Sequence, residues 1–269
     1  MNEVSEMDKQ QLFDIDVAVR SWFSTLNVTI PRLIEHMETD TKQNRFDLVT
    51  NVDRDIQQNF EQFLQHFYPS HQLLAEEKSN QQIDAYHGHV WVMDPIDGTM
   101  NLVKQQTDYC VILAYFVDSE PMLSYIYDYP NGILYKAIKG EGAYANDQPL
   151  KPPHTMDIKD AILSFNAQVL NLETVKALFD ASFSYRIIGS CGLDSMRVIK
   201  GQFGAHVNTN PKPWDIGAQF LFASELGLKM TTLNNESVDF AEGGPFIISN
   251  KGCHQQVLDI LNDGDGYQK

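Results

Sequence analysis

Five short apolar runs constrain the fold most, because each has the length and composition of a buried strand. They occupy residues 72–75, 90–93, 110–117, 123–127 and 133–137. The segment DYPNG at residues 128–132 predicts a hairpin turn between the last two runs. This part of the chain is therefore expected to form a largely antiparallel sheet.

Two amphipathic patterns precede these strands. Apolar residues recur every three or four positions from Leu12 to Met37 and predict a helix, which Pro31 should kink or split. A second stripe from Ile56 to Phe67 predicts another helix, and Thr50 with Asp53 has the spacing of its capping pair. The first part of the chain thus combines helices with a sheet.

The prolines at positions 149, 152 and 153 mark the predicted boundary between two halves. Beyond them, strand patterns at residues 161–165, 185–188 and 203–207 alternate with helix patterns at 172–179, 191–200 and 214–226. The last helix should end at Gly227. We therefore expect an antiparallel-rich α+β half at residues 1–150 and an α/β half at residues 151–269.

The charge balance excludes several classes of partner. Thirty-six acidic residues against 20 basic ones give a net charge of −16, which disfavours binding to nucleic acids or to anionic lipid. The N-terminal sequence lacks a signal-peptide pattern, and the longest apolar run, residues 109–117, is about half of the ~20 residues that a membrane helix needs. Three scattered cysteines suggest reduced thiols, so we expect a cytoplasmic protein.

The segment WVMDPIDGTMN, residues 91–101, is the most informative for chemistry. A buried strand should end at Asp94, because Pro95 opposes its continuation. Asp94 and Asp97 could then converge on divalent cations, together with the carbonyl of Ile96, and such hard oxygen ligands suit Mg²⁺. If a helix begins after Gly98, the free amides there could hold an anion.

Other acidic residues strengthen this interpretation, since the pentamer DPIDG alone is more typical of a simple turn. Glu76 and Glu77 follow a short apolar run, and Asp47 precedes the capped helix. Asp215 lies in the first turn of an apolar helix, where an acid also stabilises the helix dipole. Each has an ordinary structural explanation, and their co-occurrence is what favours a metal site.

Four segments together resemble the inositol monophosphatase family of Mg²⁺-dependent, lithium-sensitive phosphatases. They are DLVTNVD (47–53), LLAEE (73–77), WVMDPIDGTMNL (91–102) and PWDIGAQFLFASELG (213–227), in matching order and spacing. The resemblance implies a layered αβαβα fold, a homodimer, and a phosphomonoesterase acting on small phosphate esters.

The resemblance also implies roles for individual residues. One Mg²⁺ would be held by Glu76, Asp94 and the Ile96 carbonyl, a second by Asp94, Asp97 and Asp215, and a weaker third would lie near Glu76. Thr99 with Asp47 would orient and deprotonate the attacking water, and the amides of Gly98 and Thr99 would bind the phosphate. The expected substrate contacts are Asp97, Gly98, Thr99, Ser190, Cys191, Asn208 and Asp215.

The chain departs from the family pattern on the substrate side. Several relatives have a glutamate that contacts inositol hydroxyls where this chain has Asn208, while Ala75 and Leu102 replace a usual glycine and phenylalanine without changing a ligand. Hydrolysis of inositol monophosphate is the main hypothesis. The alternatives are the NADP 2′-phosphate, fructose 1,6-bisphosphate, a 3′-phosphoadenosine nucleotide, or a metal-binding protein without catalysis.

Overall fold

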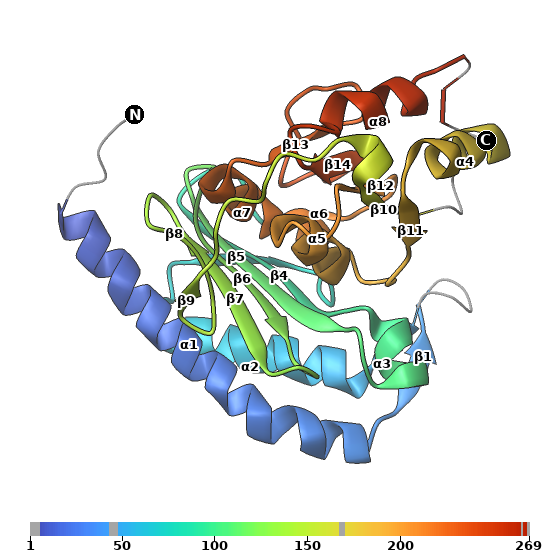
Figure 1. The fold of residues 1–269 in the computed structure, drawn as a ribbon. Helices are drawn as coiled ribbons and strands as arrows, with labels where there is room; N and C mark the ends of the chain where they lie inside the picture. The colour runs from blue at the N-terminus through green and yellow to red at the C-terminus, as the bar shows by residue number, and fades with distance from the viewer. Residues whose placement is uncertain (1–5, 43–47, 167–169, 265, 268–269) are drawn as a thin grey trace.

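The chain folds into alternating layers of helices and sheets (Figure 1). The computed structural model describes residues 6–42, 48–166, 170–264 and 266–267. Helices α1 (Glu6–Glu35) and α2 (Asn51–Phe67) cover one face of a seven-stranded sheet. Between this sheet and a five-stranded one lie α5 (Cys191–Ile199), α6 (Pro213–Ile216) and α7 (Gln219–Leu226). Because α4 (Leu172–Ala181) and α8 (His254–Leu261) cover the outer face of the second sheet, the predicted αβαβα architecture is confirmed.

The seven-stranded sheet follows chain order from β3 to β9. Its strands are β3 (Gln72–Ala75), β4 (His89–Asp97), β5 (Cys110–Val117), β6 (Glu120–Asp128), β7 (Ile133–Ile138), β8 (Gly142–Ala145) and β9 (Gln148–Pro149). Only the pair β3–β4 is parallel, so the antiparallel expectation and the turn at residues 128–132 are confirmed.

Strand β4 differs from its prediction at the end that matters for the site. It does not stop at Asp94 but continues to Asp97 through an irregular step, since Asp94 pairs with Ile112 and Asp97 pairs with Cys110. One strand thus advances by three residues while its partner advances by two, as in a β-bulge. Pro95 is tolerated because a bulge does not require its missing N–H.

The two N-terminal helices form where the apolar stripes predict them. Helix α2 begins with the expected capping box, in which Thr50 and Asp53 bond each other's backbone. Helix α1 runs to Glu35 with Pro31 inside its last turns, so of the two predicted outcomes, a kink or a split, the split does not occur. Strands β1 (Thr39–Thr41) and β2 (Leu48–Thr50) pair between the two helices.

The five-stranded sheet has the order β11-β10-β12-β14-β13. Its strands are β10 (Ile162–Phe165), β11 (Ser184–Arg186), β12 (Ala205–Asn208), β13 (Lys229–Thr232) and β14 (Phe246–Ser249), and the short helices α3 (Thr99–Gln105) and η1 (Ile158–Asp160) complete the described elements. The single helix predicted at 214–226 was wrong. It is divided into α6 and α7 at Gly217, which lies so close to β4 that an added Cβ would be 3.1 Å from Val92 Cγ1.

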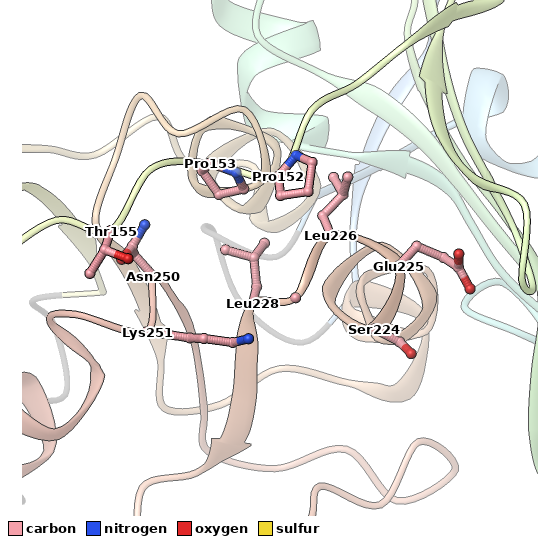
Figure 2. A pocket seen from close by; sticks show the side chains of 10 residues that line it. Pro152, Pro153, Thr155, Ser224, Glu225, Leu226, Leu228, Asn250 and Lys251 are labelled. Carbon is pink, nitrogen blue, oxygen red and sulfur yellow. The ribbon is translucent and has the colours of Figure 1, made fainter. Parts of the chain in front are cut away.

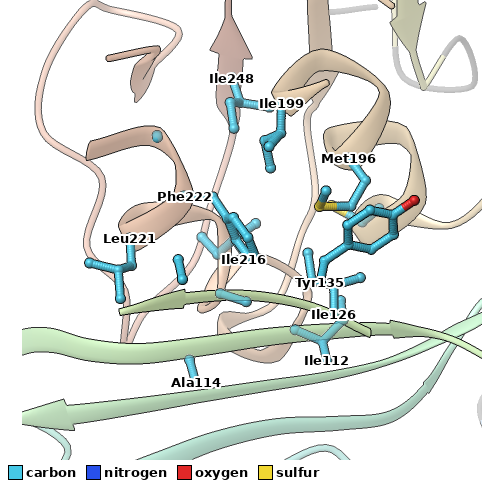
Figure 3. Close-up of a cluster of buried hydrophobic side chains, with 14 of the residues drawn as sticks. Ile112, Ala114, Ile126, Tyr135, Met196, Ile199, Ile216, Leu221, Phe222 and Ile248 are labelled. Atoms are coloured by element: carbon cyan, nitrogen blue, oxygen red, sulfur yellow. The ribbon is translucent and has the colours of Figure 1, made fainter. Parts of the chain in front are cut away.

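One hydrophobic core joins the two sheets through the helices between them. Figure 3 shows Ile112 and Ile126 of the first sheet facing Ile216 and Phe222 of the middle layer, with Ile248 of the second sheet beyond. The strands of the first sheet end at Pro149, and those of the second sheet follow it in the chain. Because one core joins both sheets, the division into halves 1–150 and 151–269 stays a prediction. Among the described residues, no helix is both long and apolar enough to cross a membrane.

Candidate metal centre

Three carboxylates from two distant segments meet between the sheets. Asp94 and Asp97 come from the bulged end of β4, and Asp215 comes from α6. One oxygen from each lies within 4.8 Å of the others. Helix α6 fixes Asp215 through its own first turn, because the backbone N–H of Lys212 donates to Asp215 Oδ2 at 2.6 Å. The structure therefore brings together three of the predicted metal ligands.

The electrostatics of this cluster favour a bound cation. Burial raises the pKa of Asp94 well above its usual range, and the nearby charges of Glu76, Asp97 and Asp215 raise it further. Burial, with Asp97 beside it, raises the pKa of Asp215 to about 7. Like charges held together in a poorly solvated place destabilise one another, so a divalent cation would lower the energy of the group.

Asp97 is oriented by the N-terminus of α5. Ser190 Oγ donates to Asp97 Oδ2 at 2.5 Å, Gly192 N donates to the same oxygen at 2.7 Å, and Cys191 N donates to Oδ1 at 3.0 Å. Gly192 is needed for this approach, since an added Cβ would lie 3.0 Å from Asp97 Oδ2. Ser190 and Cys191, predicted as substrate contacts, thus also hold a predicted metal ligand.

Glu76 stands just after β3, beside its parallel neighbour β4. Its Oε1 accepts a hydrogen bond from Lys42 Nζ at 2.6 Å, and the same ammonium forms an ion pair with Glu77. Burial raises the pKa of Glu76, while Lys42 opposes that shift. No sequence pattern pointed to Lys42, which occupies the position of a counter-ion to the predicted ligand.

Thr99 has a carboxylate partner, and that partner is Asp53. Thr99 Oγ1 lies 3.0 Å from Asp53 Oδ1 and 3.0 Å from the Ile96 carbonyl oxygen. The other oxygen of Asp53, Oδ2, accepts from Thr50 N at 2.9 Å and from Thr50 Oγ1 at 2.5 Å. Asp47, the partner predicted for Thr99, lies outside the described residues.

The remaining predicted site residues surround the cluster. Gly98 has a left-handed backbone, with φ of +93°, and α3 begins directly after it. The Ile96 carbonyl oxygen lies 3.0 Å from Thr99 Oγ1, next to the same turn. Asn208 ends β12, and its side-chain oxygen accepts from Asn210 N at 3.1 Å.

A cavity of about 410 Å³ lies elsewhere, between the segment after β9 and the end of α7 (Figure 2). Pro152, Leu226, Asn250 and Lys251 are among its lining residues, and no predicted site residue is among them. The side chain of Asn250 is used by the surrounding backbone, accepting from Met156 N and donating to the His154 carbonyl. The cavity therefore has no geometric link to the carboxylate cluster.

Comparisons with known proteins agree with this geometry. The model of the inositol monophosphatase family matches residues 9–264. The inositol-1-monophosphatase of Bacillus subtilis is 31% identical over 253 residues, covering 91% of this chain and 96% of the relative.

Two solved structures are much more similar. The chain has a TM-score of 0.95 and 64% identity to an IMPase/NADP phosphatase complexed with NADP and Ca²⁺, over 96% of this chain and 98% of that one. A dual-specific IMPase/NADP phosphatase bound with D-inositol-1-phosphate has a TM-score of 0.93 and 62% identity, over 96% and 99% of the two chains. The sequence, the layered fold and the placement of the carboxylates lead to one conclusion: the chain belongs to the inositol monophosphatase family.

Proposed function

We propose that this protein is a phosphatase that hydrolyses inositol monophosphate with the help of Mg²⁺. The observation that carries the proposal is the meeting of Asp94, Asp97 and Asp215, with one oxygen of each within 4.8 Å of the others, in a member of this family. A second substrate, the 2′-phosphate of NADP, is favoured by the 64% identity to a structure holding NADP and Ca²⁺.

The donor set fits a hard divalent cation. Carboxylate oxygens are typical Mg²⁺ ligands, and burial raises the pKa of both Asp94 and Asp215, which a bound cation would offset. We assign Glu76, Asp94, Asp97, Asp215 and the Ile96 carbonyl to two or three such ions. When bound, the ions would supply Lewis-acid polarisation of the phosphate and neutralise its charge in an otherwise acidic protein.

The attacking water is oriented by Thr99 and Asp53 in this proposal. A hydroxyl has one proton, and Asp53 Oδ1 at 3.0 Å is its carboxylate acceptor. Thr99 Oγ1 can then accept the proton that a water molecule gives up. Asp53, which accepts the hydroxyl proton of Thr99, would stabilise this transfer. Because Asp53 Oδ2 is held by Thr50, the pair is fixed before any substrate arrives.

The substrate side is assigned to the residues around the turn after β4 and the start of α5. The amides at Gly98 and Thr99, where α3 begins, would contact the phosphate. Ser190 and Cys191 at the start of α5, with Asn208 at the end of β12, would face the alcohol portion. An amide at position 208 can bond a hydroxyl without adding charge, which suits more than one alcohol.

We also propose a homodimer through the exposed edge of the second sheet. Strand β11 is at the end of its sheet, and Phe183 (75% exposed) and Ile187 (57% exposed) flank it, with Tyr185 between them. Such an apolar edge is a liability for a monomer and suits a second copy of the chain. Phe183→Asp should convert the dimer to a monomer in light scattering, and an unchanged mass would contradict this assignment.

Cytoplasmic location stays a proposal as well. Cys110, Cys191 and Cys253 are all buried free thiols, which is the usual state in a reducing compartment.

The test is phosphate release by the purified protein, with and without Mg²⁺ and lithium. The substrates are inositol 1-phosphate, NADP, fructose 1,6-bisphosphate and 3′-phosphoadenosine 5′-phosphate. We expect Mg²⁺-dependent release that lithium inhibits, fastest with the first two. No release from any ester would reject the proposed activity.

Two variants test the water-activating pair. Asp53→Asn keeps the shape and the helix cap but removes the charge beside Thr99, and we expect kcat to fall at least about 100-fold. Asp55→Asn, an exposed acid on the same helix, is the matched control and should retain the rate. Equal rates in both variants would remove Asp53 from the mechanism.

A further inference from the structure

Helix α2 carries a row of polar side chains that contact the segments following β3 and β4. Asp53, Gln57 and Glu61 follow one another at four-residue spacing, so they lie on one face of the helix. Asp53 is fully buried and Gln57 is 4% exposed. Burial of a polar side chain costs free energy unless it is hydrogen-bonded, so the partners of these residues indicate what they do. The proposed hydrolysis uses Asp53 but not Gln57.

Gln57 joins helix α2 to the segment after β3. Its Oε1 accepts a hydrogen bond from Glu77 N at 2.8 Å, and its Nε2 donates to Glu61 Oε1 at 3.1 Å. A backbone N–H can only donate and an ionised carboxylate can only accept, so one orientation of the amide satisfies both partners. A glutamate at position 57 would add a charge beside Glu61, and an apolar side chain would remove the acceptor of Glu77 N. Glutamine therefore fits both contacts.

This contact lies next to a predicted metal ligand, because Glu76 directly precedes Glu77 in the chain. On the other side of Glu76, the side chain of Asn80 accepts from Ala75 N at 3.1 Å and donates to Ala75 O at 2.8 Å. Amide side chains thus hold the backbone on both sides of Glu76. Asn80 belongs to the same segment as Glu76, whereas Gln57 ties that segment to helix α2.

We propose that Gln57 is a positioning residue, which holds Glu76 at a fixed distance from the water-activating pair of Asp53 and Thr99. This inference rests on the proposed function, because it takes Glu76 as a metal ligand and Asp53 as the partner of Thr99. Four residues of helix separate Asp53 from Gln57 by about 6 Å along a rigid axis. Burial is the largest cause of the raised pKa of Glu76, and the charge of Asp53 adds to it, which agrees with their closeness.

Calorimetric titration with Mg²⁺ tests the inference without any substrate. Gln57→Met keeps the length of the side chain and the helix propensity but removes both hydrogen bonds. We expect it to weaken binding of the ion assigned to Glu76 about 10-fold, the lower end of the range for groups that orient a metal ligand. Glu76→Gln identifies that binding step in the same titration. Gln58→Met is the matched control, because it makes the same change at an exposed position one residue later and should leave the affinity unchanged.

An exchange variant separates positioning from stability. In the double variant Gln57→Glu/Glu61→Gln the net charge is unchanged, position 57 keeps an acceptor for Glu77 N, and the hydrogen bond between positions 57 and 61 can form in the reverse direction. We expect this variant to recover most of the lost Mg²⁺ affinity. Gln57→Asn, whose amide is one carbon shorter, tests the same contact with a polar side chain and should weaken Mg²⁺ binding about 2- to 10-fold.

The kinetic constants should divide in a way that a loss of stability alone would not produce. At saturating Mg²⁺ we expect Gln57→Met to lower kcat for inositol 1-phosphate about 10-fold with KM nearly unchanged, because the residues assigned to the substrate keep their places. Equal Mg²⁺ affinity in Gln57→Met, Gln57→Asn and the wild type would overturn the inference and leave the proposed function intact. A wild-type chain that binds no Mg²⁺ would overturn both.

Discussion

The first sheet and the helix layer next to the second sheet supply different groups to the carboxylate cluster. The ends of β3 and β4 in the first sheet bring the charge, with Glu76, Asp94 and Asp97. The layer next to the second sheet brings mostly hydrogen-bond donors, through the start of α5, and one carboxylate from α6.

Asp94 and Asp97 show what this difference means, because they lie three residues apart on one strand. Asp94 accepts a backbone hydrogen bond from Ile96 N at 3.0 Å, within its own turn. Asp97 accepts from Ser190, Cys191 and Gly192, all from the far segment. Asp94 is therefore held by the first sheet, while the orientation of Asp97 depends on how the helices of the second half pack against it.

The largest effect should come from removing charge on the side of the first sheet. We expect Asp94→Asn to lower kcat/KM by at least about 1,000-fold, or about 4 kcal/mol, because this carboxylate is shared by the assigned metal sites. The fold should persist, since the variant relieves repulsion in a buried cluster. Phosphate release and circular dichroism check both statements, and a rate near that of the wild type would reject the metal assignment.

Disturbing the hydrogen-bond donors that the second half provides to Asp97 should lower activity less than Asp94→Asn does. In Gly192→Ala the new Cβ would lie 2.9 Å from Cys110 Sγ and 3.0 Å from Asp97 Oδ2, so the start of α5 must shift. Overpacking of this kind costs about 1–3 kcal/mol of stability, and a misplaced Asp97 should lower kcat about 10- to 100-fold. Arg197→Ala on the same helix is the control. Unchanged Mg²⁺ dependence in Gly192→Ala would show that α5 does not position Asp97.

The strands of the first sheet could be predicted from the sequence, whereas the contacts between the two halves could not. Apolar runs bounded by turns predicted strands β3 to β7, because period and composition are local properties. The bulge at Asp94–Asp97 and the break at Gly217 depend on partners far along the chain, Cys110 for one and Val92 for the other. Local sequence patterns do not show which distant residues will become such partners.

The same limit explains the residues that the sequence did not assign to the site. Asp53 was interpreted as a helix cap, which accounts for Oδ2 but leaves Oδ1 free for Thr99. The convergence of Asp94, Asp97 and Asp215 followed from the family resemblance and agrees with the structure, while their roles as ligands stay predictions.

Removing divalent cations should destabilise the protein through the same charges. Mg²⁺ at a hundredfold excess over its Kd would add about 2.7 kcal/mol, which corresponds to a rise in Tm of about 5–10 °C for a chain of this size. EDTA should reverse the rise, and Asp94→Asn should reduce it. An identical Tm in EDTA and in Mg²⁺ would argue against clustered unpaired carboxylates.

The pH dependence of the metal-free protein should have an unusual sign. Asp215 has its pKa raised to about 7 in the fold, against an ordinary value of 3.8 in the unfolded chain. Between these values only the folded state keeps the proton, so the free energy of unfolding falls as pH rises from about 4 to about 7, by at most about 1.4 kcal/mol per pH unit for this group. Urea unfolding in EDTA measures the slope, which Asp215→Asn should make shallower. A free energy of unfolding that rises with pH over this range would contradict the raised pKa of Asp215 in the folded protein.

The smallest effect concerns Lys42, the cation that the chain itself places beside Glu76. Its ammonium lies 2.6 Å from Glu76 Oε1, where a metal ion would compete for the same oxygen. We expect Lys42→Met to tighten Mg²⁺ binding about two- to five-fold, the range for a partly exposed ion pair. Lys78→Met, which removes a lysine paired with Glu61, is the control. Calorimetric titration decides the matter: weaker binding in Lys42→Met would mean that Lys42 orients Glu76 for the metal rather than competing with it, and the first sheet would then supply positioning as well as charge.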